Sequence, residues 1–160
     1  IMNITVICLG KLKEKYLRDA IDEYAKRISA YGKLDVIELN PARLSDNPSQ
    51  TEIENALQKE AEEIKKKIPN NSYTFALCIE GKEKSSEGFA KIINDAAVSG
   101  KSNITFIIGS SFGLSPEIKA LADNRLSFSP MTFPHQLMRV MLLEQVYRAF
   151  KINNNESYHK

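Results

Sequence analysis

The chain has few of the residues that build stapled or fibrous proteins. Its 160 residues include two cysteines, seven glycines, six prolines and no tryptophan. So little glycine and proline excludes a collagen-like or low-complexity chain. Cys8 and Cys78 cannot form a disulfide framework, and both lie inside apolar runs, where buried free thiols are expected. This cysteine usage suits a reducing cytoplasm.

Long apolar runs are also missing. None approaches the ~20 residues that a spanning helix needs, so no membrane segment is expected. Charges follow the first apolar stretch instead of preceding it, which argues against a secretory signal. Met2 is expected to be the natural start. A hydrophobic content of 42% and a net charge of +2 predict one folded domain and not a disordered chain. An isoelectric point near 8.5 permits a nucleic-acid partner without requiring one.

Strand-like and helix-like patterns alternate along the chain. Short apolar or alternating runs predict strands at Asn3–Cys8, Leu34–Leu39, Tyr73–Ile79, Ile104–Ile108 and Leu126–Ser129. Apolar faces of helical spacing and capping residues predict helices over Leu17–Tyr31, Ser49–Ile68, from Ser85 or Ser86 to Gly100, from Ser115, and over Pro134–Ile152. This alternation predicts a three-layer α/β domain with a mostly parallel sheet, in which Tyr73–Ile79 and Ile104–Ile108 are covered on both faces.

The last predicted helix has almost no polar face. An all-round apolar helix is buried on all sides. The helix is therefore expected either to thread into the core or to bury its second face against another copy of the chain, and we favour a homodimer interface. Val140 and Leu143 are expected to contribute to that interface.

Three loops follow predicted strands and are candidates for ligand binding. Ligands of open parallel sheets bind beyond the carboxyl ends of the strands. The loops there are Glu80–Ser86, Gly109–Gly113 and Phe128–His135. Glycines at the strand ends would let a ligand approach the backbone closely, although a plain tight turn would also explain them.

The loop sequence GSSFG also matches the nucleophile elbow of serine hydrolases. In that reading Ser111 is the nucleophile, and Asp123 with His135 or His159 completes a triad. The next helix starts only at Ser115, which stretches the required strand–turn–helix by several residues. A second alternative is a non-catalytic module that binds RNA or a nucleotide. No metal site is expected, because the two histidines are far apart and lack nearby carboxylates, and no phosphate-binding glycine motif is present.

The C-terminal third concentrates residues that could carry chemistry. Arg139 and Arg148 lie nine positions apart on one helix, so they point to opposite sides and cannot share a cluster within one subunit. Glu144 precedes Arg148 by four positions, which predicts an ion pair on the helix. The tail ends in Tyr158, His159 and Lys160, residue types that stack on bases and bind phosphate. Such a tail is otherwise expected to fray.

Together these segments resemble a known family. The segments LSFSPMTFPHQLMRVMLLEQVYRAFKI, FIIGSSFG, the terminal YHK and VICLGKLKEKYLRDAIDEYAKRI are similar to the RlmH (YbeA) family of SPOUT-class α/β-knot methyltransferases. The resemblance covers essentially the whole chain. It implies a C-terminal trefoil knot, a homodimer, S-adenosylmethionine as methyl donor, and methylation of N3 of a pseudouridine in 23S ribosomal RNA of the large subunit or whole ribosome.

The resemblance also implies roles for individual residues. The cofactor is expected at Leu77, Gly109, Phe128, Ser129, Pro130, Met131, Thr132 and Phe133. Pro130 has no N–H, so its neighbours would supply the hydrogen bonds to the adenine. The expected catalytic residues are His159 near the target base, His135 as a loop-to-helix anchor, Arg139 and Tyr158. The two histidines are chosen because they can exchange a proton near neutral pH. Arg148 and Lys160 are expected to bind RNA.

Overall fold

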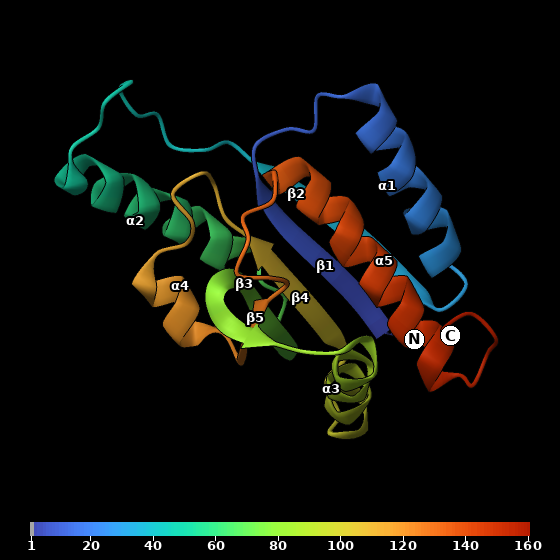
Figure 1. Ribbon diagram of the computed structural model, residues 1–160. Helices are drawn as coiled ribbons and strands as arrows, with labels where there is room; N and C mark the ends of the chain where they lie inside the picture. Colours follow the sequence, from blue (N-terminus) through green and yellow to red (C-terminus); the bar gives the residue numbers. More distant parts are fainter. Residues whose placement is uncertain (1) are drawn as a thin grey trace.

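A computed structural model describes residues 2–160 as an α/β fold (Figure 1). Its strands are β1 (Met2–Leu9), β2 (Gly32–Leu39), β3 (Ser72–Glu83), β4 (Asn103–Ile108) and β5 (Asn124–Ser127). Its helices are α1 (Lys15–Ile28), α2 (Gln50–Lys67), α3 (Ser86–Val98), α4 (Pro116–Leu121) and α5 (His135–Asn153). Every predicted strand and helix is present, so the predicted alternation is confirmed.

The five strands form one parallel sheet in the order β2-β1-β4-β3-β5. One core lies on the sheet face covered by α1, α3 and α5 and includes Phe75, Phe106 and Leu142. A second core lies on the face covered by α2 and α4 and includes Ile107 and Ile118. Two cores on opposite faces confirm the three layers, and the continuous apolar runs of the central strands reflect burial on both sides.

The helix starts follow the capping chemistry of the sequence. Ser49 accepts a hydrogen bond from the N–H of Glu52, and the Glu52 side chain accepts one from the N–H of Ser49, which makes a capping box for α2. Ser85, and not Ser86, caps α3. Ser115 caps α4, with a proline in the first turn.

The connections leave β1 and β4 in opposite directions. The chain runs from β1 to β2 at one edge of the sheet and from β4 past β3 to β5 at the other. The helices that follow, α1 and α4, cover opposite faces (Figure 1). The carboxyl ends of β1 and β4 are therefore a topological switch point, where open α/β sheets leave a crevice.

Three predicted boundaries differ from the structure. Strand β3 continues beyond Ile79 to Glu83, because after a register shift Lys82 and Glu83 pair with β5. The last strand is Asn124–Ser127 instead of Leu126–Ser129, and α1 ends at Ile28. Coverage of β3 on both faces is also incomplete, since the Ile79 side chain is 51% exposed. Pairing partners that are distant in sequence set the strand ends, and a local pattern does not contain them.

Much of the apolar surface of helix α5 is buried within its own chain. It packs on the sheet and against both α1 and α3 (Figure 1). Leu143 is 1% exposed and belongs to the core of its own chain, so its predicted place in a dimer interface is wrong. Val140 and Met141 are only half-buried and lie outside both cores. Among residues 2–160, each helix is too short or too polar to traverse a bilayer.

Candidate functional site

A cavity of about 360 Å³ opens at the carboxyl ends of β3, β4 and β5. Its volume falls in the range of small-molecule sites, ~300–1,000 Å³. The lining comes from the strand ends, the GSSFG loop, α4, the loop before α5 and the start of α5. Its members are Leu77–Glu80, Ile108–Leu114, Lys119, Leu126–Ser129, Met131–Phe133, His135 and Met138.

Most residues predicted to bind the cofactor meet around this cavity. Leu77, Gly109, Phe128, Ser129 and Met131–Phe133 line it. Pro130 is exposed and lies outside the lining. The loop is ordered by its own hydrogen bonds, since the Ser129 hydroxyl accepts from the N–H of Met131 (3.0 Å). Lys119 and Met138 were not predicted to line the cavity, because they carry no motif and reach it only through the packing of α4 and α5.

Gly81 and Gly109, the glycines predicted to end two strands, lie within β3 and directly after β4, and close approach of the chain to itself explains both. A Cβ at Gly109 would collide with the backbone oxygen of Gly113, on the far side of the same turn. A Cβ at Gly81 would lie 2.7 Å from the Arg125 carbonyl, where β3 and β5 approach. Both glycines permit close approach of the chain to itself, so a side chain at Gly109 would disturb the loop that builds the cavity.

His135 and Arg139 stand at the start of α5 with different surroundings. His135 lines the cavity and is half-buried. Its pKa is lowered from the ordinary value of 6.5, first by burial and then by the Arg139 cation, so the ring is neutral at pH 7. Arg139 is 3% exposed and donates to Glu38 Oε2 (2.7 Å) and to the Gly10 carbonyl (2.8 Å). Arg139 therefore ties α5 to the ends of β1 and β2.

The serine hydrolase alternative lacks a triad. The Asp123 carboxylate accepts a hydrogen bond from the Thr74 N–H (2.8 Å), so it is engaged at the start of β5. Within residues 2–160, no hydrogen bond joins Ser111, Asp123 and either histidine. Ser111 lies in a tight turn closed by a hydrogen bond from Gly113 N–H to the Ser110 carbonyl (2.8 Å), and α4 begins only at Pro116. The hydrolase reading is wrong for this chain.

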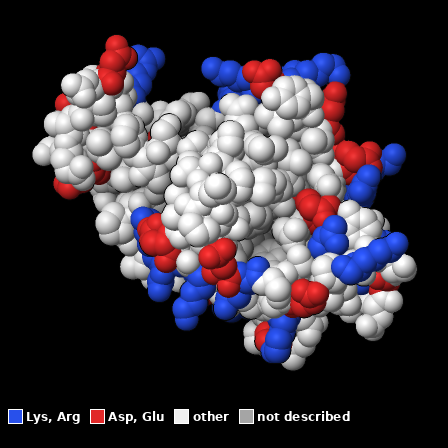
Figure 2. Space-filling view, in the orientation of Figure 1, with Lys and Arg blue, Asp and Glu red and all other residues white. Residues whose placement is uncertain are grey.

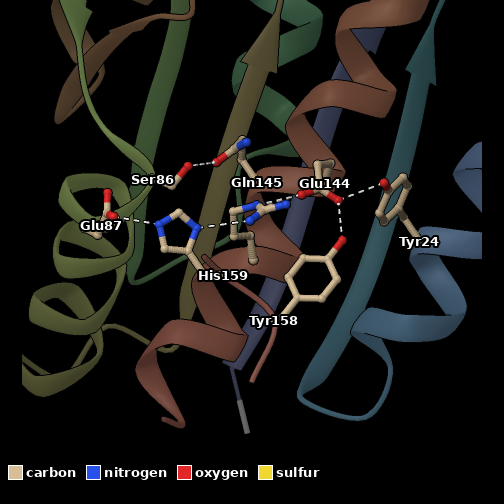
Figure 3. A network of polar contacts seen from close by, with 8 residues as sticks. Tyr24, Ser86, Glu87, Glu144, Gln145, Tyr158 and His159 are labelled. Atoms are coloured by element: carbon tan, nitrogen blue, oxygen red, sulfur yellow. Dashed lines mark hydrogen bonds and ion pairs between the residues drawn. The ribbon is translucent and has the colours of Figure 1, made fainter. Parts of the chain in front are cut away.

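The C-terminal tail is docked on the other half of α5, so the expectation that it frays is wrong. Figure 3 shows Tyr158 and Tyr24 converging on Glu144, with His159 between Glu87 and the α5 helix. Both tyrosine hydroxyls donate to Glu144 Oε2, at 2.9 and 2.8 Å. His159 contacts Glu87 Oε1 at 2.6 Å and Arg148 at 3.0 Å.

Arg148 completes this network with the predicted ion pair. Its Nε donates to Glu144 at 2.8 Å, and its guanidinium lies over the Tyr158 ring, 4.7 Å from the centroid. Burial alone would raise the pKa of Glu144, but hydrogen bonds from Tyr24, Tyr158 and Arg148 lower it overall. Burial, followed by the hydrogen bond to Glu144, raises the pKa of Tyr24 to about 12. The network thus holds one ionised carboxylate among donors.

The tail and the cavity of the chain do not meet. His135 and Arg148 are separated by thirteen positions of a continuous helix, roughly 20 Å along its axis. His159 sits against Arg148, and Arg148 and Arg139 belong to separate clusters as predicted. The residues predicted to be catalytic are therefore divided between two places. His135 lies at the cavity, whereas Tyr158 contacts Glu144 in the middle of α5 and His159 contacts Arg148 one turn further on.

Known proteins resemble the chain over its full length. The family described as "Predicted SPOUT methyltransferase" matches residues 2–159. Relatives named "Ribosomal RNA large subunit methyltransferase H" are 57% identical in Clostridium perfringens, 55% in Clostridium novyi and 55% in Clostridioides difficile. Each alignment spans 99% of this chain and 100% of the relative. A solved structure, a probable methylase family protein from Haemophilus influenzae Rd KW20, shares the fold with a TM-score of 0.52 and 16% identity, over 99% of this chain and 70% of that one.

These matches agree with the parallel sheet and the cavity at its carboxyl edge. The chain belongs to the SPOUT methyltransferases and, within them, to the RlmH family that its sequence resembles.

Proposed function

We propose that the protein transfers a methyl group from S-adenosylmethionine to N3 of a pseudouridine in 23S ribosomal RNA. The observation that carries this proposal is one cavity at the strand ends that gathers nearly all the residues expected to bind the cofactor. The full-length relatives named for large-subunit ribosomal RNA support the substrate. The half-buried and buried free thiols Cys78 and Cys8 support the reducing cytoplasm as the place of action.

The cavity suits a molecule with a planar base and an apolar edge. Leu77, Ile108 and Leu126 form an apolar wall, and the turns at Gly109–Gly113 and Ser127–Phe133 supply backbone polar groups. Bound S-adenosylmethionine would supply an electrophilic methyl group. The trefoil knot typical of the family is part of the proposal. It is supported by the close approach of the 109–114 and 128–133 loops around one cavity.

The chain's own part in the chemistry is alignment and proton removal. An imide nitrogen is mostly protonated at neutral pH, so a base assists its attack. His135 is neutral at pH 7 and lines the cavity, so it is suited to accept that proton or to relay it. Arg139 is a positioning residue, because it holds the start of α5 against β1 and Glu38.

Roles for Tyr158, His159, Arg148 and Lys160 require a second copy of the chain. The tail lies far along α5 from its own cavity, so it can reach reacting atoms only in a partner's site. A homodimer is supported by α5 itself, whose outward residues Val140 and Met141 are apolar and belong to neither core. Figure 2 adds an uncharged area at the centre of this face with charged side chains around its rim.

Calorimetric titration with S-adenosylhomocysteine, together with methylation of undermodified ribosomes, tests the proposal. We expect one cofactor per cavity and methyl transfer to the large-subunit RNA. Affinity for RNA without affinity for the cofactor would instead establish a binding module without catalysis.

A further inference from the structure

A second groove lies beside the cofactor cavity. Its volume is about 580 Å³, and it is enclosed by the end of β1, the loop to α1, the GSSFG loop and the start of α5. Its lining includes Leu9–Lys11, Glu14, Tyr16, Leu17, Pro41, Ser110, Ser111, Pro134–Leu137 and Arg139. The groove therefore occupies the switch point between β1 and β4, the place where open α/β sheets bind ligands.

The groove and the cofactor cavity share a wall. Ser110, Ser111 and His135 line both spaces. Methyl transfer requires the attacking atom to come within about 3–3.5 Å of the methyl carbon. A molecule in the groove can approach one in the cavity at this shared wall, and there it meets His135.

The exposed cation Lys11 lines the groove together with the acid Glu14, and further cations follow it in the chain beside the groove. Residues 11–18 contain Lys11, Lys13, Lys15 and Arg18 against the single acid Glu14, and all four cations are exposed. Lys15 pairs with Asp19, whereas Lys11 and Lys13 make no ion pair among residues 2–160. Figure 2 shows blue side chains, with red ones among them, along the edge of the molecule above the uncharged face and over the start of α1. Exposed cations beside the groove complement phosphates.

The interior of the groove offers stacking and hydrogen bonding. Tyr16 is 69% exposed and Leu137 40% exposed, which leaves an unpacked aromatic ring and an apolar side chain at the opening. Arg139 lies at the base and is 3% exposed, and its buried Nε has no hydrogen-bond partner among the described residues. Planar bases stack on such rings, and base carbonyls accept hydrogen bonds.

We infer that this groove binds the acceptor nucleotide of the RNA, with its base against Tyr16 and its flanking phosphates on Lys11 and Lys13. The inference rests on the proposed function and names where its substrate enters. The reacting edge of the base then lies at Ser110 and His135, which the groove shares with the cofactor cavity.

Steady-state methylation of undermodified ribosomes by Tyr16→Ala, Tyr16→Phe and a Lys11→Gln/Lys13→Gln double variant tests this assignment. Tyr16→Ala should raise KM for ribosomes about tenfold through lost stacking, while Tyr16→Phe stays near wild type. The double variant should reduce the slope of log affinity against log salt by roughly 1.5, as expected for two lost phosphate contacts. The affinity for S-adenosylhomocysteine should not change.

A matched control carries the same charge change elsewhere. Lys66→Gln/Lys67→Gln removes two exposed cations from the end of α2 and should leave KM and the salt slope unchanged. Unchanged KM in Tyr16→Ala would overturn the assignment. If the wild-type protein does not methylate undermodified ribosomes, the proposed function is rejected, and this assignment with it.

The competing occupant is a second copy of the chain. With p-benzoylphenylalanine in place of Tyr16, irradiation of the protein on ribosomes should crosslink position 16 to ribosomal RNA. A crosslink to another copy of the chain, or dissociation of the dimer in Tyr16→Ala by light scattering, would show that the groove is a subunit interface and overturn the inference.

Discussion

His135 shows how one side chain can serve both structure and chemistry. It begins α5, lines both cavities and has a pKa lowered by burial and by Arg139. A base acts in its neutral form, so activity is lost as pH falls through the lowered pKa. We expect kcat/KM to decline at a lower pH than it would with an unperturbed histidine as the base. His135→Gln should remove this decline and reduce kcat by about 10²-fold, as measured in pH–rate profiles. An identical profile in the variant would assign the proton to another group.

Arg139 is expected to matter first for stability. Its buried guanidinium donates to Glu38 and to the carbonyls of Leu9 and Gly10. Arg139→Ala therefore leaves two backbone acceptors and a partly exposed carboxylate without these hydrogen bonds. We expect the free energy of unfolding in urea to fall by about 2–3 kcal/mol. Arg125→Ala, at an exposed site, should change it by less than about 0.5 kcal/mol. Equal stability of the two variants would contradict the anchoring role.

At the scale of elements, the tail is more firmly held than its sequence suggests. Deletion of Tyr158–Lys160 removes the hydrogen bonds to Glu144, Arg148 and Glu87. We expect a loss of about 1–2 kcal/mol in urea unfolding, since these partners are partly exposed. Cofactor affinity should persist, because the cavity is untouched, while ribosome methylation falls steeply. Removal of Lys160 alone is the control for stability, and full activity of the longer deletion would exclude the tail from the chemistry.

The elements also show what a sequence can predict. Buried parallel strands such as Ile104–Ile108 read as apolar runs, and Ser49 with Glu52 forms a capping box within four residues. The polar end of β3 was missed because only pairing with β5 keeps it extended. The docked tail was missed for a similar reason, since Glu87 lies 72 positions from its partner His159. Local patterns predict elements, whereas contacts between distant segments set their ends and build the site.

The whole molecule is expected to be a homodimer that buries the outward side of α5. A dimer should have a mass of about 36 kDa in light scattering, twice the 18.0 kDa of the chain. Val140→Glu should weaken it, because an unpaired charge would be buried on the outward side of α5. Val98→Glu, at a site 79% exposed on α3, is the matched control and should remain dimeric. A well-folded wild-type monomer would contradict the dimer and any role for the tail in a partner's site.

Nucleoside mass spectrometry of ribosomal RNA tests the proposed reaction. Ribosomes from a strain that lacks this gene would be incubated with the purified protein and S-adenosylmethionine, and the 23S RNA digested to nucleosides. We expect N3-methylpseudouridine to be absent before incubation and to form afterwards. Formation should depend on both protein and cofactor. A digest that stays unmethylated with folded, cofactor-bound protein, or a methyl group on another nucleoside, would contradict the proposed reaction.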